Sequence, residues 1–197
     1  MTRKQNRDIK FLTHKDLNIL FKSIENTSKT NKFMIRDLLI FNLAYYCWLR
    51  ISEIALIKRE NYNQHTKEIY IKRLKGSLNS TIKLDTKREK LINKYLKEFP
   101  KSDNETLFSS CTGRPLEKAS IEYLTTKYSD LSGLHNFHFH MLKHSIAVHL
   151  LEVWLSLFEL KNYLWHKSID STLVYSTFTK QMSEEMYKKI NSQDLLV

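Results

Sequence analysis

The chain has 197 residues, which is enough for one hydrophobic core of ordinary size and too few for two, so we expect a single domain over residues 1–197. Its 32 basic residues outnumber 21 acidic ones, and the net charge of +11 favours a polyanionic partner such as nucleic acid, although a lysine-heavy genome would give a similar composition. No signal-peptide core or membrane-length apolar run occurs, and Cys47 and Cys111 form no CxxC pair, so we expect a cytoplasmic protein with no membrane contact.

Helical periodicity dominates the pattern. Thr13, followed three residues later by Asp16, is typical of a helix start, and apolar residues then recur at helical spacing: Leu17, Leu20, Phe21 and Ile24. Further helices are predicted over 32–48, over 51–63 as a short helix that ends in a polar turn, over 86–99 and over 117–131. The region from 138 onward reads as helix, with a turn and a short helix between His166 and Tyr175.

One segment has a different periodicity. The stretch "KEIYIKRLKGSLNSTIKL" (67–84) alternates apolar and polar residues on both sides of Gly76, which predicts a β-hairpin. The predicted fold is therefore mainly α with a small antiparallel hairpin or sheet (α+β).

Motif searches exclude several classes of site. There is no GxxxxGK[ST] loop, no GxGxxG after a strand and no GxSxG elbow, so no nucleotide cofactor is expected. In "HNFHFHMLKH", His140 and His144 lie one helical turn apart, but residue 141 is Met where a zinc protease needs Glu. We therefore expect no metal, and metal-dependent hydrolysis remains an alternative that rests on this histidine cluster alone.

Four segments taken together carry a more specific signal. They are "WLRISEIAL" (48–56), "RLKGS" (73–77), "HMLKHSIAVHLLE" (140–152) and "LWHKSIDSTLVY" (164–175). In this order and spacing they resemble the catalytic domain of the tyrosine recombinases, the phage integrase family, and most of all the small fimbrial phase-switch invertases and Xer-type recombinases. The resemblance spans roughly residues 10–190 and implies that fold without a separate N-terminal core-binding domain.

The resemblance implies roles at a DNA phosphate. Arg50 would neutralise the phosphoryl oxygens through its planar fork, and Glu53 would orient that site unless it is a surface carboxylate. Lys75 at the hairpin tip would protonate the leaving 5′ oxygen, with Lys72 and Lys83 as neighbouring candidates.

The remaining roles fall in the C-terminal half. His140 would hold the proton of the attacking phenol, and His166 would donate a hydrogen bond to a phosphoryl oxygen. Tyr175, nine residues after His166, would be the nucleophile, because Tyr163 and Tyr187 lack a histidine at that interval.

The sequence departs from the family motifs at several positions. Lys143 stands where the family has its second arginine, which keeps the charge but loses the bidentate fork. Trp48, Trp154 and Trp165 each stand at a family glycine, in a chain with only 3 Gly. Our hypothesis is that these codons are UGA and specify glycine in the source organism.

The predicted function follows from the resemblance. We expect a site-specific DNA recombinase that cleaves and rejoins strands through a 3′-phosphotyrosyl intermediate, without ATP, cofactor or metal. Its partners would be double-stranded DNA, further copies of itself in a tetrameric synapse of two paired sites, and accessory DNA-bending proteins. A catalytically impaired DNA-binding relative is the alternative, favoured if the tryptophans are genuine.

Overall fold

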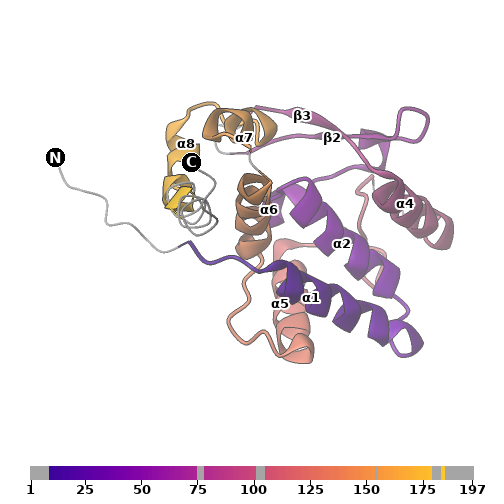
Figure 1. Ribbon diagram of the computed structural model, residues 1–197. Helices are drawn as coiled ribbons and strands as arrows, with labels where there is room; N and C mark the ends of the chain where they lie inside the picture. Colours follow the sequence, from indigo (N-terminus) through magenta and orange to yellow (C-terminus); the bar gives the residue numbers. More distant parts are fainter. Residues whose placement is uncertain (1–8, 75–77, 101–104, 154, 179–182, 185–197) are drawn as a thin grey trace.

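The computed structural model describes residues 9–74, 78–100, 105–153, 155–178 and 183–184. The elements in chain order are α1 (His14–Asn26), η1 (Thr27–Lys29), α2 (Met34–Tyr46), α3 (Ile51–Ala55), η2 (Arg59–Asn61), β1 (Tyr62–Asn63), β2 (Glu68–Ile71), β3 (Ser80–Lys83), α4 (Thr86–Glu98), α5 (Lys118–Ser132), α6 (His140–Glu152), α7 (Leu157–Tyr163) and α8 (Asp170–Leu173). This arrangement of helices around a small sheet confirms the predicted fold class (Figure 1).

Helix α2 is the centre of the core. All residues from Ile35 to Ala44 are buried, because α1, α4 and α6 pack around it (Figure 1). Helix α1 begins as predicted: the Thr13 hydroxyl accepts from the Asp16 N–H, and the Asp16 carboxylate accepts from the Thr13 N–H at 3.0 Å. That cap satisfies two backbone donors that the first turn would otherwise leave unpaired.

The sheet is antiparallel and has the order β1-β2-β3. Ile69 pairs with Ile82 across β2 and β3, and both side chains are buried, which confirms the hairpin prediction. Gly76 lies outside the described residues. Strand β1 was not predicted, because two residues are too few to show an alternating pattern.

Two predicted helical regions were too long. The segment 51–63 is helical only as far as Ala55 and then forms η2 and β1. The region after residue 138 is not continuous, since α6, α7 and α8 are separated by non-helical residues. Ser156 caps a new helix by accepting from the Glu159 N–H at 3.2 Å, and Trp165 leaves that helix in the left-handed region at φ 52°.

Candidate active site

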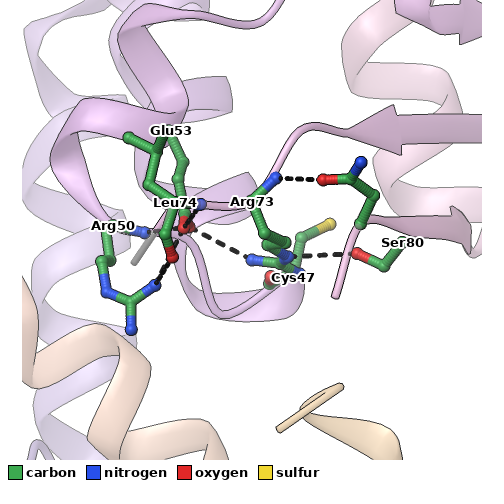
Figure 2. A network of polar contacts seen from close by, with 7 residues as sticks. Cys47, Arg50, Glu53, Arg73, Leu74 and Ser80 are labelled. Atoms are coloured by element: carbon green, nitrogen blue, oxygen red, sulfur yellow. Dashed lines mark hydrogen bonds and ion pairs between the residues drawn. The ribbon is translucent and has the colours of Figure 1, made fainter. Parts of the chain in front are cut away.

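Glu53 is a buried carboxylate on α3 that joins two separate segments. Its oxygens accept hydrogen bonds from the backbone N–H of Arg50 at 2.9 Å and from the backbone N–H of Leu74 at 3.1 Å. Figure 2 shows this carboxylate between the start of α3 and the strand that leads into the hairpin. Glu53 is 1% exposed, so the reading of it as a surface carboxylate is wrong.

Arg73 lies on the other side of Glu53 from Arg50 (Figure 2). Its guanidinium donates to Glu53 at 3.3 Å, to the Ser80 hydroxyl at 3.1 Å and to the Cys47 carbonyl at 3.0 Å. The sequence analysis did not assign this arginine a role, although it sits in the quoted motif "RLKGS". The Arg73 side chain is buried, so it stabilises the site from the interior of the protein.

The pKa of the Glu53 carboxyl reflects this setting. Burial would raise its pKa, but the N–H donors of Arg50 and Leu74 and the charges of Arg73 and Arg50 outweigh burial, and the pKa is lowered. Glu53 is therefore ionised at neutral pH and compensates two cations.

Arg50 is the predicted first phosphate-binding cation. Its Nη1 donates to Glu53 at 2.9 Å and to the Leu74 carbonyl at 3.1 Å, while 24% of the side chain remains exposed. The two hydrogen bonds fix the orientation of the guanidinium, and the exposed part of the side chain lies at the protein surface. Lys75, the next residue after Leu74 and the predicted general acid, lies outside the described residues.

Lys143 and His166 belong to the same cluster of positive charge. Burial, then repulsion by Arg50 and by Arg73, lowers the pKa of Lys143 to about 8, although Glu53 opposes the shift. Burial, followed by the charges of Lys143, Arg50 and Arg73, lowers the pKa of His166 to about 4. The side chains therefore act on one another electrostatically, although they come from α6, the start of α3, the hairpin and the α7–α8 turn.

A buried contact fixes the ring of His166. Its Nδ1 lies 2.9 Å from the hydroxyl of Thr172, a fully buried residue on α8. The ring is neutral at pH 7 and this contact fixes its orientation; when the Thr172 hydroxyl donates to Nδ1, the ring proton lies on Nε2. Thr172 is a second residue to which the sequence analysis gave no role.

Tyr175 is buried, with 2% of its surface exposed, just after α8. Its hydroxyl lies 2.7 Å from Nδ1 of His144, one residue beyond Lys143 on α6. His140, expected to hold the phenol's proton, is exposed, and its ring packs against His144 with centroids 4.8 Å apart. The role of His140 stays a prediction, and His144 is the residue that sequence reasoning passed over, although it ends the quoted "HMLKH".

The described residues contain one group of three potential metal ligands, His14, His149 and Glu152, with ligand atoms within 4.8 Å of one another. The His14 and His149 rings are stacked, with centroids 3.7 Å apart, so their lone pairs run side by side and do not converge on one point. The group lies where α1 begins and α6 ends. No helix in the described part of the chain is long and apolar enough to cross a membrane.

Comparison with known families identifies the lineage. A sequence profile described as "Phage integrase family" matches residues 10–182. The chain belongs to the phage integrase family. The motif resemblance found in the sequence is thereby confirmed.

Named relatives agree with this assignment. The Escherichia coli K12 "Type 1 fimbriae regulatory protein FimB" is 27% identical over 175 residues, covering 87% of this chain and 86% of that protein. "Tyrosine recombinase XerC" of Alcanivorax borkumensis is 29% identical over 168 residues, covering 82% of this chain and 54% of the relative. The chain thus spans about half of XerC but most of FimB.

Solved integrase-family structures have the same fold. A XerH site-specific recombinase bound to palindromic difH substrate, a post-cleavage complex, superposes with TM-score 0.79 at 24% identity, over 94% of this chain and 55% of that one. The XerA recombinase superposes with TM-score 0.76 at 20% identity, over 91% and 64%.

Proposed function

We propose that this chain is a site-specific DNA recombinase that cleaves and rejoins strands through a 3′-phosphotyrosyl link at Tyr175. One observation carries the proposal. Arg50, Lys143 and His166 come from separate segments of the chain, yet the charge of Arg50 acts on Lys143, and both charges act on the neutral ring of His166, beside a buried carboxylate. Gathering like charges is unfavourable unless an anion is meant to enter, and a phosphodiester is the anion that the family resemblance implies.

The proposed step balances as a transesterification. The Tyr175 oxygen bonds to phosphorus as its phenolic proton passes to His140, the bond from phosphorus to the 5′ oxygen breaks, and Lys75 supplies the proton to that leaving oxygen. Arg50 and Lys143 neutralise the non-bridging oxygens, whose negative charge grows as the nucleophile attacks, and His166 donates to one of them. The phosphotyrosyl ester conserves the energy of the broken bond, so rejoining requires no ATP.

The relatives favour an active enzyme. XerC is named a tyrosine recombinase, and the XerH structure is a post-cleavage complex, so the alternative of a catalytically impaired DNA-binding relative has no support from them. Metal-dependent hydrolysis, the other alternative, rests on the "HNFHFHMLKH" histidines; the group of potential metal ligands in the described residues is a different one, His14, His149 and Glu152.

We further propose double-stranded DNA as the substrate and a tetramer of this chain on two paired sites as the active assembly. XerH and a lambda integrase dimer were solved bound to DNA, which supports DNA binding and more than one subunit for this family. Accessory DNA-bending proteins and a cytoplasmic location complete the proposal.

The test is a nicked suicide substrate, whose cleaved fragment diffuses away and traps the covalent complex. The wild-type chain should form a protein–DNA adduct stable in detergent, and Tyr175→Phe should bind the same DNA without forming it, because only the nucleophilic oxygen is lost. Tyr163→Phe is the matched control and should retain the adduct. An adduct that persists in Tyr175→Phe but not in Tyr163→Phe would reassign the nucleophile.

A further inference from the structure

The hydroxyl of Tyr175 is held by a residue outside the proposed phosphate-binding set. It lies 2.7 Å from Nδ1 of His144, and both side chains are withdrawn from solvent. Burial and the neighbouring charges of His140 and Lys143 lower the pKa of His144 to about 4, so its ring is neutral at pH 7. In the tautomer with the ring proton on Nε2, Nδ1 accepts the tyrosine O–H.

The surroundings of Tyr175 keep its hydroxyl protonated. Burial alone raises the pKa of Tyr175, with no opposing effect from Arg50 or Lys143, whereas both of those charges act on His166. A phenol in contact with a phosphate-binding cluster would have its ionised form stabilised by the cations. The tyrosine is therefore protonated at neutral pH, in hydrogen-bond contact with His144.

We propose that His144 is a positioning residue that holds Tyr175 in this resting place, and that cleavage begins when the hydroxyl exchanges His144 for the DNA phosphate. The proposal rests on the proposed role of Tyr175 as nucleophile. Because the hydrogen bond between Tyr175 and His144 must break first, its free energy adds to the barrier of the cleavage step. His144 therefore slows cleavage.

Single-turnover cleavage of a suicide half-site tests this role at equal DNA occupancy. His144→Phe keeps a ring in the same place but removes the acceptor, so adduct should form about threefold to tenfold faster, the factor that one hydrogen bond of ordinary net strength corresponds to. His144→Asn, whose side-chain oxygen can take the place of Nδ1, should restore the wild-type rate. His144→Ala repeats the comparison without the bulk of a ring, in case the larger side chain impairs folding.

Slower cleavage by both His144→Phe and His144→Ala would overturn the proposal, because the ring would then be needed as a proton acceptor. An unchanged rate would overturn it as well, because the contact would then have no influence on the reaction. A wild-type protein that forms no adduct would instead refute the proposed function, so the two failures are distinguishable.

An independent observation concerns three helix ends. After α2, the Trp48 N–H donates to Tyr45 at 3.2 Å, the Leu49 N–H donates to Ala44 at 3.0 Å, and Trp48 has φ 46°. This pair of bonds around a left-handed residue is the Schellman motif, in which glycine is the usual left-handed residue.

The end of α7 repeats the pattern. The Trp165 N–H donates to Asn162 and the His166 N–H donates to Lys161, both at 3.1 Å, with Trp165 at φ 52°. A large side chain in the left-handed region is strained, because its Cβ approaches the following carbonyl oxygen.

The chain also contains the motif with glycine. After α5, the Gly133 N–H donates to Asp130 at 3.2 Å and the Leu134 N–H donates to Ser129 at 3.0 Å, around Gly133 at φ 70°. After α6, the N–H of Leu155 donates five residues back to Leu150 at 3.3 Å, and Trp154 lies outside the described residues.

We infer that the protein made in its source organism carries glycine at positions 48, 154 and 165. Two of the 3 tryptophans, Trp48 and Trp165, occupy the position that this motif reserves for a left-handed residue, and position 154 is included because Trp154 also stands at a family glycine. UGA differs from the tryptophan codon UGG only in its last base. If the organism translates UGA as glycine, translating the same gene with a code in which UGA means tryptophan would give this pattern.

Two measurements test the inference. Peptide masses of the protein isolated from its source should show glycine at all three positions, and tryptophan there, or a UGG codon at any of them, overturns it. In the protein with tryptophan at these positions, the Tm of Trp165→Gly should be about 2–4 °C higher than the Tm of Trp165→Ala. Alanine shortens the side chain but keeps the Cβ that strains the left-handed conformation. Gly133→Ala is the control in the opposite direction: it puts a side chain on a left-handed glycine and should lower Tm. Equal Tm values for Trp165→Gly and Trp165→Ala would show that there is no left-handed strain at residue 165 and would overturn the inference.

Discussion

At the scale of single residues, the site depends on one buried anion that compensates two cations. Glu53 contacts Arg50 at the surface and Arg73 in the interior, so it supports a functional side chain and a structural one at the same time. A buried charge is destabilising unless it is paired with an opposite charge. Loss of the Glu53 anion would leave the buried guanidinium of Arg73 unpaired and lower the free energy of unfolding.

Glu53→Gln should lower the free energy of unfolding by about 3 kcal/mol, because Arg73 would remain buried without a counter-charge. Urea denaturation at neutral pH measures the change. Glu105→Gln, which removes an exposed partner of Lys58, is the control and should leave stability unchanged within error.

The same carboxylate predicts a dependence of stability on pH. Its pKa is lowered in the folded protein, so its stabilising effect is complete above the ordinary carboxyl pKa and is lost as pH falls through the lower folded value. The acid-side loss of stability should therefore be smaller in Glu53→Gln than in the wild type. Parallel acid titrations of the two proteins would contradict the assignment.

Lys143 leads to a prediction about activity. Burial and Arg50 lower its pKa to about 8, so the lysine loses its proton on the alkaline side, where an arginine would stay charged. The ratio of Lys143→Arg to wild-type cleavage rates should rise several-fold between about pH 7 and pH 9. Taking a ratio cancels the effect of pH on Tyr175, which both proteins share. A ratio that does not change with pH would mean that the charge of Lys143 does not act on the phosphate. Lys143→Ala, which has no charge at this position, should be nearly inactive at every pH.

Sequence reasoning found the residues that motif spacing marks and missed those that act through contacts. Tyr175 and His166 were found from their nine-residue interval. Arg73, His144 and Thr172 were not assigned roles, because their partners are known only once the hairpin, α6 and α8 have been brought together.

At the scale of elements, α8 links both halves of the proposed chemistry. Its four residues carry Thr172, which holds His166, and lead directly into Tyr175. A short helix therefore sets the distance between the proposed phosphate donor, His166, and the proposed nucleophile, Tyr175.

Thr172→Val should slow cleavage about fivefold to tenfold, since it keeps the buried shape but removes the hydroxyl that fixes the tautomer of His166. Thr172→Ser retains the hydroxyl and should cleave at close to the wild-type rate. Single-turnover adduct formation measures both, and equal rates for valine and serine would show that the contact is structural only.

One of the two errors at the element scale has a cause that can be read in the sequence. The region after residue 138 was predicted as helix because no glycine or proline interrupts it, yet helices end just before residues 154 and 165. Both positions hold tryptophan, which gives no stop signal. The hairpin was predicted correctly because its alternation spans enough residues to be recognised.

At the scale of the whole molecule, the net charge of +11 should dominate DNA affinity. If about six to ten phosphates are neutralised, affinity should fall roughly 10³- to 10⁵-fold between about 50 and 200 mM salt. Fluorescence anisotropy with a labelled half-site measures the slope. Tyr175→Phe should show the same slope as the wild type, and an affinity indifferent to salt would argue against DNA as the main partner.

The order in which the site residues occur along the chain has a consequence during synthesis. Arg50, Glu53 and Arg73 leave the ribosome first, Lys143 and His166 follow, and Tyr175 comes after all of them. At about 5–20 residues per second, several seconds separate the first cation from the nucleophile. A nascent chain can therefore acquire a surface that attracts nucleic acid well before it can break a strand, and a message truncated ahead of codon 175 would yield a binder that cannot cut.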